Sequence, residues 1–198
     1  MWEGGSSSVV RLFVAVEIDP GIRDTIASCS DELRRRSAHA PRARITWVPS
    51  ERLHVTVRFI GEVDAARAEA IAAVFAPDVP LAPFELALER VGTFPEHGPP
   101  RVLWAGVGVG ADALVALERE VSLRLDRCGV PREDRPYHPH LTLARVREPG
   151  GLRTTAWLEG LSERRFGVSS VNAITLFESR PSRQGHVYVA LRRTRLTS

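Results

Sequence analysis

A short pattern occurs twice in the chain, each time inside a predicted strand, and it constrains the fold more than any other feature. Residues 54–58 read His-Val-Thr-Val-Arg, and residues 140–145, which begin 86 positions later, read His-Leu-Thr-Leu-Ala-Arg. Residues i and i+2 of a strand point to the same side of a sheet, so each His lies beside its Thr while the intervening Val or Leu enters the core. We expect the two strands to meet and to form the floor of a cleft.

The segments around these patterns alternate between strands and helices in both halves of the chain. Apolar runs bounded by turn residues predict strands over 11–18, 45–48, 53–61, 84–92, 101–109 and 140–146. Helices are predicted over 20–39, over 65–75 behind an Asp64 cap, and from Asp112 as N-cap to Cys128, with Gly129 as C-cap. Residues 168–180 and 186–194 are predicted to close the fold as an antiparallel pair.

This order of elements favours an α+β fold of two similar lobes over an all-parallel α/β sheet. The 198 residues are 43% hydrophobic, which is enough for one substantial core. Residues 1–9 include a Gly/Ser-rich stretch and are predicted to form a flexible N-terminal segment, with residues 10–198 as a single bilobal domain. No apolar run reaches the roughly 18 residues that a membrane span needs, and the opening lacks a secretory signal, so we expect a cytoplasmic protein that does not bind membranes.

The two patterns predict a site that contains two imidazoles, of His54 and His140, and two hydroxyls, of Thr56 and Thr142. The ordinary pKa of histidine, roughly 6.5, allows one imidazole to act as a base while the other acts as an acid. Hydroxyls can donate to the non-bridging oxygens of a phosphate. These groups suit an in-line displacement at a phosphodiester, in which one imidazole activates an attacking hydroxyl or water and the other protonates the departing oxygen.

Three further residues are candidates for binding the substrate. Arg58 lies four residues after His54, so an unbroken strand would point it into the cleft, whereas a solvated strand end is the alternative. Arg145 lies five residues after His140 and would face away unless a bulge intervenes. Trp104 could stack a base of RNA, although packing in the core is the favoured interpretation.

Other patterns are more simply explained by structure. All 27 basic residues are arginine, which fits either a genomic bias or phosphate recognition. His138 and His140 lack the nearby Asp, Glu or Cys that a zinc site would add, and the glycine-rich segment 106–111 lacks the following strand of a dinucleotide site. The two cysteines, Cys29 and Cys128, are predicted to fill helix faces. We therefore expect no metal and no cofactor.

Together with their flanking segments, the two motifs resemble the 2H phosphoesterases, and within them the bacterial and archaeal LigT-like RNA 2′,3′-cyclic phosphodiesterases, also described as 2′-5′ RNA ligases. The matching segments are the opening strand 11–18, the signatures 47–63 and 137–146, the middle strand 101–107 and the C-terminal pair 176–189. The resemblance covers about residues 10–195.

This resemblance implies two pseudo-symmetric lobes of antiparallel sheet with flanking helices around a central cleft, and metal-independent chemistry. It implies His54 as proton donor and His140 as proton acceptor, and the second signature of the family usually carries an arginine at the place of Arg145. From the residues themselves we expect Thr56, Thr142, Arg58 and Arg145 to hold the phosphate. The expected reaction opens the 2′,3′-cyclic phosphate end of an RNA, or a small cyclic nucleotide, and leaves a 2′-phosphate. The same site could instead run reversible 2′-5′ ligation, or the chain could be a non-catalytic module that binds RNA ends. We expect a monomer.

Overall fold

The computed structural model describes residues 9–182 and 185–198, so the expectation for residues 1–8 lies outside the described residues. The strands are β1 (Val10–Glu17), β2 (Arg44–Trp47), β3 (His54–Val63), β4 (Val79–Pro80), β5 (Phe84–Phe94), β6 (Val102–Val107), β7 (His140–Glu148), β8 (Arg165–Val171), β9 (Ala173–Ser182) and β10 (Gly185–Thr197). The helices are α1 (Pro20–Arg36), α2 (Ala65–Val74), α3 (Ala111–Asp126) and α4 (Thr154–Trp157), with short 3₁₀ turns η1 (Ser37–His39) and η2 (Ser50–Arg52).

The described strands form one sheet whose middle is the junction of β3 and β7. The order is β4-β10-β9-β1-β3-β7-β6-β5-β8, and β2 adds to β7. Neighbouring strands are antiparallel except for the short pair of β4 and β10. We call the strands from β4 to β3 the first lobe, and β7, β6, β5, β8 and β2 the second lobe. The arrangement confirms the predicted α+β class, and each lobe contributes one motif strand to the junction.

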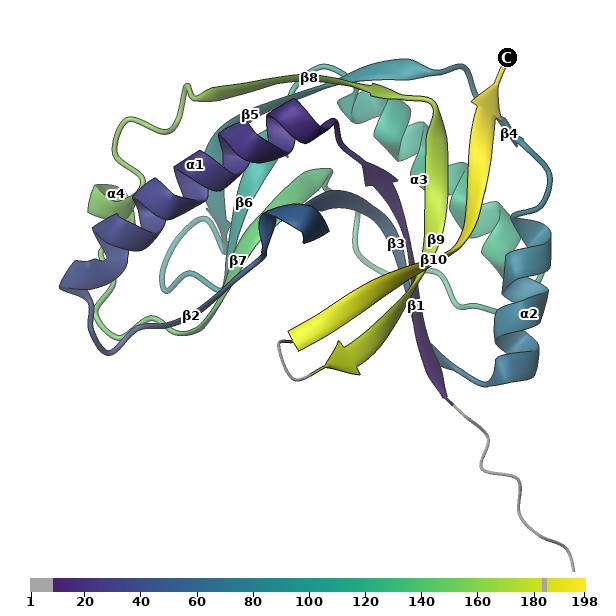
Figure 1. Cartoon of the computed structure of the whole chain (residues 1–198), viewed down its shortest axis with the longest axis horizontal. Coiled ribbons are helices and arrows are strands. Elements are labelled where there is room, and N and C mark those ends of the chain that lie inside the picture. The colour runs from purple at the N-terminus through teal and green to yellow at the C-terminus, as the bar shows by residue number, and fades with distance from the viewer. Residues whose placement is uncertain (1–8, 183–184) are drawn as a thin grey trace, which may run out of the picture.

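Each of the two long helices packs on the lobe that does not contain the strand preceding it (Figure 1). Helix α1 follows β1 of the first lobe but packs on β8 of the second, whereas α3 follows β6 of the second lobe and packs on β3 of the first. Helix α1 buries Ile22, Ile26, Cys29 and Leu33, the face that its spacing predicts. The expected two similar halves are therefore present, but they exchange their helices across the junction.

Two predicted elements need correction. Residues 168–180 do not form one strand: the chain leaves β8, which pairs with β5, and after Asn172 enters β9, which pairs with β1 and β10. The predicted closing pair is thus correct only for β9 and β10. Helix α3 begins at Ala111 behind Gly110, which has φ 88°, and Asp112 lies in the first turn instead of capping it. A Cβ at Gly110 would lie 2.4 Å from the Glu85 carbonyl oxygen, so this close approach requires glycine.

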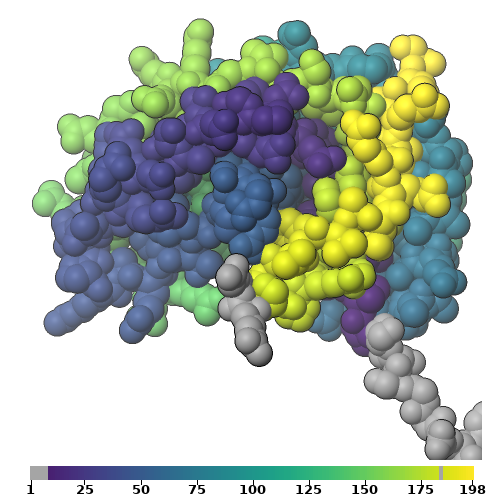
Figure 2. All heavy atoms as spheres, viewed as in Figure 1, coloured from purple at the N-terminus to yellow at the C-terminus, as the bar shows by residue number. Residues whose placement is uncertain are grey.

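The β9–β10 hairpin lies against the turn that leads into the first motif strand. In Figure 2 the yellow atoms of β10 touch the blue atoms around residue 50. The Arg52 guanidinium donates a hydrogen bond to the His186 carbonyl across this contact. The hairpin is thereby placed beside His54. None of the described helices is long and apolar enough to cross a membrane.

Candidate active site

The junction of β3 and β7 places both histidines and both threonines on one face of the sheet. Val55 pairs with Leu141, and both are fully buried in the core. Because side chains alternate along a strand, the flanking residues on both strands project to the opposite face, and all of them are half-buried there: His54, Thr56, His140 and Thr142. In this register His54 and His140 are diagonal neighbours, and such neighbours lie about 7–8 Å apart in a regular antiparallel ladder. One phosphate group can therefore contact side chains from both motifs.

The two imidazoles are oriented by the same local hydrogen bond. His54 Nδ1 lies 2.7 Å from the Arg52 carbonyl oxygen, and His140 Nδ1 lies 2.7 Å from the His138 carbonyl oxygen. A carbonyl accepts only, so each Nδ1 carries the proton and each Nε2 is the atom that can exchange one with a substrate. His54 Nε2 lies 3.1 Å from Thr56 Oγ1, so the pair inside one motif is already in contact.

Aromatic rings pack against both imidazoles, and no sequence motif marks these aromatic residues. The ring of His54 packs against Phe13 of β1 and Tyr188 of β10, with centroids 5.1 and 5.4 Å away. The ring of His140 meets Phe94 of β5 edge to face at 5.1 Å. These residues come from strands far apart in sequence, so only the sheet order could have indicated their place.

Burial is the main cause of a lowered pKa at both histidines. The hydrogen bonds to the carbonyls of Arg52 and His138 act in the opposite direction, and the positive charge of Arg145 lowers the pKa of each histidine further. Both imidazoles are therefore predominantly neutral at pH 7 in the free protein. An anionic substrate favours the imidazolium form, so binding itself promotes the protonated state that a general acid requires.

A bulge in β7 brings Arg145 to the histidine face. Thr142 pairs with Trp104 and Ala144 pairs with Leu103, so Leu143 is the additional residue, and both Leu143 and Ala144 are fully buried. The extra residue reverses the alternation, and Arg145 becomes exposed on the side of His140 and Thr142. Its charge acts on both histidines. This is the bulge on which the expectation for Arg145 depended.

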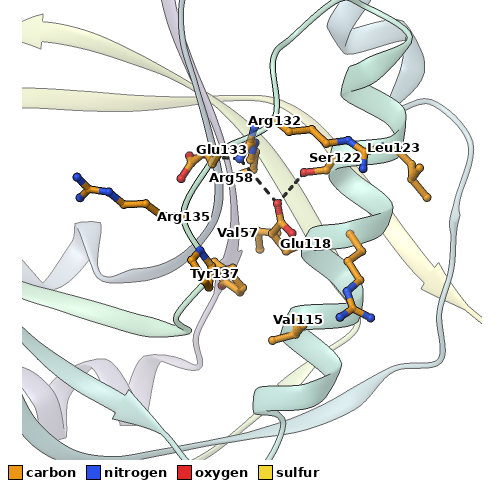
Figure 3. A pocket seen from close by; sticks show the side chains of 12 residues that line it. Val57, Arg58, Val115, Glu118, Ser122, Leu123, Arg132, Glu133, Arg135 and Tyr137 are labelled. Atoms are coloured by element: carbon orange, nitrogen blue, oxygen red, sulfur yellow. Dashed lines mark hydrogen bonds and ion pairs between the residues drawn. The ribbon is translucent and has the colours of Figure 1, made fainter.

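The corresponding bulge in β3 removes Arg58 from that face, so the expected orientation of Arg58 is wrong. Thr56 pairs with Ala15 and Arg58 pairs with Val14, which leaves Val57 as the extra residue. Arg58 is only 5% exposed and points toward α3 (Figure 3). There its guanidinium donates to the Pro131 carbonyl at 2.6 Å and forms ion pairs with Glu118 and Glu133 at 3.8 and 3.4 Å. The next residue, Phe59, is 47% exposed on the histidine face instead.

Trp104 packs against its neighbours on β6 and β5. It lies opposite Thr142 in the register, but its indole rests on Gly92, where a Cβ would come within 2.3 Å of Cζ2. Its ring also lies 5.3 Å from that of Phe94. The buried indole Nε1 has no hydrogen-bond partner among the described residues. Trp104 is thus half-buried on the face of Thr142 and is not part of the buried core, so the core interpretation is wrong. Its ring supports Phe94 beside His140, and stacking of a base stays a prediction.

No group of three or more His, Cys, Asp or Glu side chains that could hold a metal ion occurs within residues 9–182 and 185–198. Within segment 106–111, a Cβ on Gly110 would collide with the backbone of Glu85, whereas one on Gly108 would meet only the carboxylate of Glu89, which can move. Gly110 therefore allows β5 and the start of α3 to approach each other closely.

Comparisons with known proteins show the family of this chain. The profile of the 2′-5′ RNA ligase superfamily matches residues 22–179. Proteins named RNA 2′,3′-cyclic phosphodiesterase from Methanocaldococcus jannaschii and Methanothermobacter thermautotrophicus are 29% and 31% identical, over 92% and 94% of this chain and 99% of each relative.

Among solved structures, a Thermus thermophilus protein has a TM-score of 0.76 at 26% identity, over 94% of this chain and 97% of that one. Escherichia coli LigT complexed with 3′-AMP has a TM-score of 0.70 at 27% identity, over 96% of this chain and all of that one. The resemblance inferred from the two histidine motifs is confirmed, and the chain belongs to the 2′-5′ RNA ligase superfamily.

Proposed function

We propose that this chain is an RNA 2′,3′-cyclic phosphodiesterase that opens a terminal 2′,3′-cyclic phosphate and leaves a 2′-phosphate. The observation that carries the proposal is the pair of imidazoles on one sheet face, each oriented by a carbonyl at Nδ1. Relatives that match nearly the whole chain are named for this activity. We further propose that residues 10–198 act as one unit, as a cytoplasmic monomer.

In the proposed reaction, water attacks the phosphorus in line with the bond to the 3′ oxygen. The Nε2 of His140 takes a proton from the water as the new P–O bond forms. The bond from phosphorus to the 3′ oxygen breaks, and the imidazolium of His54 gives its proton to that oxygen, so the product is a 3′-hydroxyl next to a 2′-phosphate. The assignment of donor and acceptor follows the family resemblance, because the two Nδ1 contacts are alike.

The remaining groups of the face hold the phosphate. The hydroxyls of Thr56 and Thr142 can donate to its non-bridging oxygens, and Arg145 supplies the positive charge. Arg58 is not part of this set because its guanidinium is paired with Glu118 and Glu133 on the other side of β3.

The test is turnover of a short RNA that ends in a 2′,3′-cyclic phosphate, followed by ³¹P NMR and by resistance of the product to a phosphatase specific for 3′-phosphate. We expect a 2′-phosphate, and we expect the rate to persist in EDTA because the described donor set consists of imidazoles and hydroxyls. A 3′-phosphate product, or loss of activity in EDTA that zinc or magnesium restores, would contradict the mechanism. Joining of a 5′-hydroxyl RNA to the same end would indicate ligation, and binding without turnover would indicate an RNA-end binding module.

A further inference from the structure

The two motif strands are joined by very little backbone pairing. Within the described residues, β3 pairs with β7 through Val55 and Leu141 alone, whereas β3 pairs with β1 along its whole length. Continuing the register would place Val57 opposite Pro139, whose nitrogen carries no hydrogen to donate. Other contacts must therefore keep the two histidine motifs at a fixed spacing.

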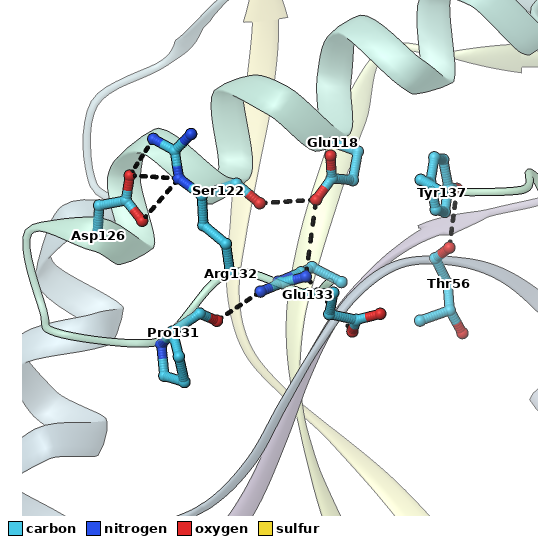
Figure 4. A network of polar contacts seen from close by, with 9 residues as sticks. Thr56, Glu118, Ser122, Asp126, Pro131, Arg132, Glu133 and Tyr137 are labelled. Carbon is cyan, nitrogen blue, oxygen red and sulfur yellow. Dashed lines mark hydrogen bonds and ion pairs between the residues drawn. The ribbon is translucent and has the colours of Figure 1, made fainter. Parts of the chain in front are cut away.

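The dipeptide of Tyr137 and His138 contacts both motifs at once. The Tyr137 hydroxyl donates a 2.8 Å hydrogen bond to the backbone carbonyl of Thr56 (Figure 4). Thr56 Oγ1 in turn contacts His54 Nε2. The neighbouring carbonyl, of His138, accepts the hydrogen bond from His140 Nδ1. One short segment thus touches the backbone of the first motif and the imidazole of the second.

The segment that carries Tyr137 is anchored to the same strand at a second point. Residues 131–139 contain no helix or strand, but the Arg58 guanidinium binds the Pro131 carbonyl and pairs with Glu133. Arg58 and Tyr137 line one cavity of about 550 Å³ between β3 and α3 (Figure 3). Burial, followed by the negative charge of Glu118, raises the pKa of Tyr137 above its ordinary value of about 10, so the hydroxyl is protonated and can donate around neutral pH.

We propose that Tyr137 is a positioning residue: its hydroxyl holds the Thr56 carbonyl and so fixes the first histidine motif relative to the second. Without this bond the Thr56 carbonyl loses its donor, and β3 can shift relative to the segment that orients His140. A misplacement of about 1 Å can lower a rate by roughly 100-fold when two groups must act on one substrate. The activity readout of this inference rests on the proposed phosphodiesterase function.

The main test compares Tyr137→Phe with Ser122→Ala. Ser122 lies in the same cavity, and its hydroxyl bonds to Glu118 at 2.6 Å but not to β3, so its removal is a matched loss of one hydroxyl. For Tyr137→Phe we expect kcat to fall by roughly 10- to 100-fold with an unchanged KM and a slightly lower thermal midpoint, since one part-buried hydrogen bond is lost. For Ser122→Ala we expect an unchanged kcat. Equal kcat values in Tyr137→Phe and wild type would overturn the proposal, as would a KM effect without a kcat effect.

A double-mutant cycle tests the path of the effect. If Tyr137 acts by positioning the first motif, Tyr137→Phe will cause little further loss in a His54→Ala variant, which already lacks the proton-transfer group of that motif, whereas independent roles will give additive losses. Additive losses would contradict the proposed path.

A third measurement does not depend on activity, so it separates this inference from the proposed function. In the wild-type protein the Tyr137 hydroxyl proton should give a slowly exchanging NMR resonance with cross-peaks to residues of β3. Tyr137→Phe should also shift the ring resonances of both His54 and His140. A hydroxyl proton that exchanges freely with water would overturn the proposal, even if the wild-type protein were inactive on RNA.

Discussion

Phe59 and Arg145 occupy equivalent positions in the two motif strands, five residues after His54 and five residues after His140. Each lies beyond a bulge that adds one buried residue to its strand, and each is exposed. The ring of Phe13 contacts both His54 and Phe59, so Phe59 shares the histidine face. The two lobes are therefore alike in their histidines and threonines but not beyond them: one offers an aromatic ring and the other a cation.

This asymmetry predicts that Arg145, and not Arg58, contributes to phosphate binding. Loss of a charged hydrogen bond costs about 1.5–3 kcal/mol, so Arg145→Gln should lower kcat/KM by roughly 10- to 150-fold. Since the Arg145 charge lowers the pKa of both histidines, both limbs of the pH profile should also move to higher pH. Steady-state kinetics across pH measures both effects.

Arg58→Gln is the matched control for that change. It leaves Glu118 and the Pro131 carbonyl without their cation, so the free energy of unfolding should fall by about 1–3 kcal/mol in urea titrations. The phosphate-binding face keeps its charge, and the limbs of the pH profile should stay in place. An Arg58→Gln variant with displaced limbs, next to an Arg145→Gln variant with the wild-type profile, would contradict the assignment.

Substitution of the histidines tests the paired mechanism. His54→Ala and His140→Ala each remove one proton-transfer partner, which should lower kcat by roughly 100- to 10,000-fold. The double variant should lose less than the product of the two single losses, because the imidazoles act as a unit. Rapid-quench turnover on the cyclic-phosphate RNA measures the rates. A single variant that keeps more than about a tenth of the wild-type rate would be outside the range for general acid–base catalysis.

The lowered pKa values set the pH dependence of the reaction. In kcat/KM, which reports the free protein, both limbs of the bell should be centred below about pH 6.5, the ordinary pKa of histidine. A bound phosphate anion favours imidazolium, so the kcat profile should lie at higher pH than the kcat/KM profile. Coincident profiles, or a bell centred above the ordinary pKa, would disagree with buried histidines.

The same shifts affect stability. A histidine with a lowered pKa in the folded state binds fewer protons than in the unfolded chain, so its contribution to stability is present above about pH 6.5 and is lost as the pH falls through the folded-state pKa. Urea titrations should show this loss in the wild-type protein. The loss should be smaller in the double alanine variant, which no longer contains the two imidazoles.

Period-two alternation was enough to place His54 beside Thr56 and His140 beside Thr142, because the bulge residues follow the Thr in both strands. It failed for Arg58, one residue beyond a bulge, since a single inserted residue reverses every later side chain. The equal spacing of Phe59 and Arg145 from their histidines was a signal that could have been used. To use this spacing, one would have had to know that both strands contain a bulge at the same position.

Long-range placement was beyond the reach of local patterns. Nothing near Tyr137 in the sequence shows that its hydroxyl meets Thr56, 81 residues earlier. The exchange of α1 and α3 between the lobes also depends on sheet order, as does the separation of β8 from β9 at Asn172. Such features follow from packing between distant segments, which the alternation of polar and apolar residues does not encode.

The contact of His140 with Phe94, and of Phe94 with Trp104, gives a final prediction at Gly92 of β5. A Cβ there would lie 2.3 Å from the indole of Trp104, so Gly92→Ala must displace this ring and with it Phe94, which packs on His140. Overpacking of this kind costs about 1–3 kcal/mol in unfolding free energy. We expect that loss in urea titrations together with a lower kcat.

Gly21→Ala is the control for the alanine itself. Gly21 lies in the first turn of α1 with nothing within 4 Å of its missing Cβ, so alanine there should leave kcat unchanged and raise stability by at most about 1 kcal/mol. If Gly92→Ala matched Gly21→Ala in both stability and rate, Trp104 would be free to move, and its support of Phe94 beside His140 would be wrong. Stacking of an RNA base would then be the remaining prediction for this indole.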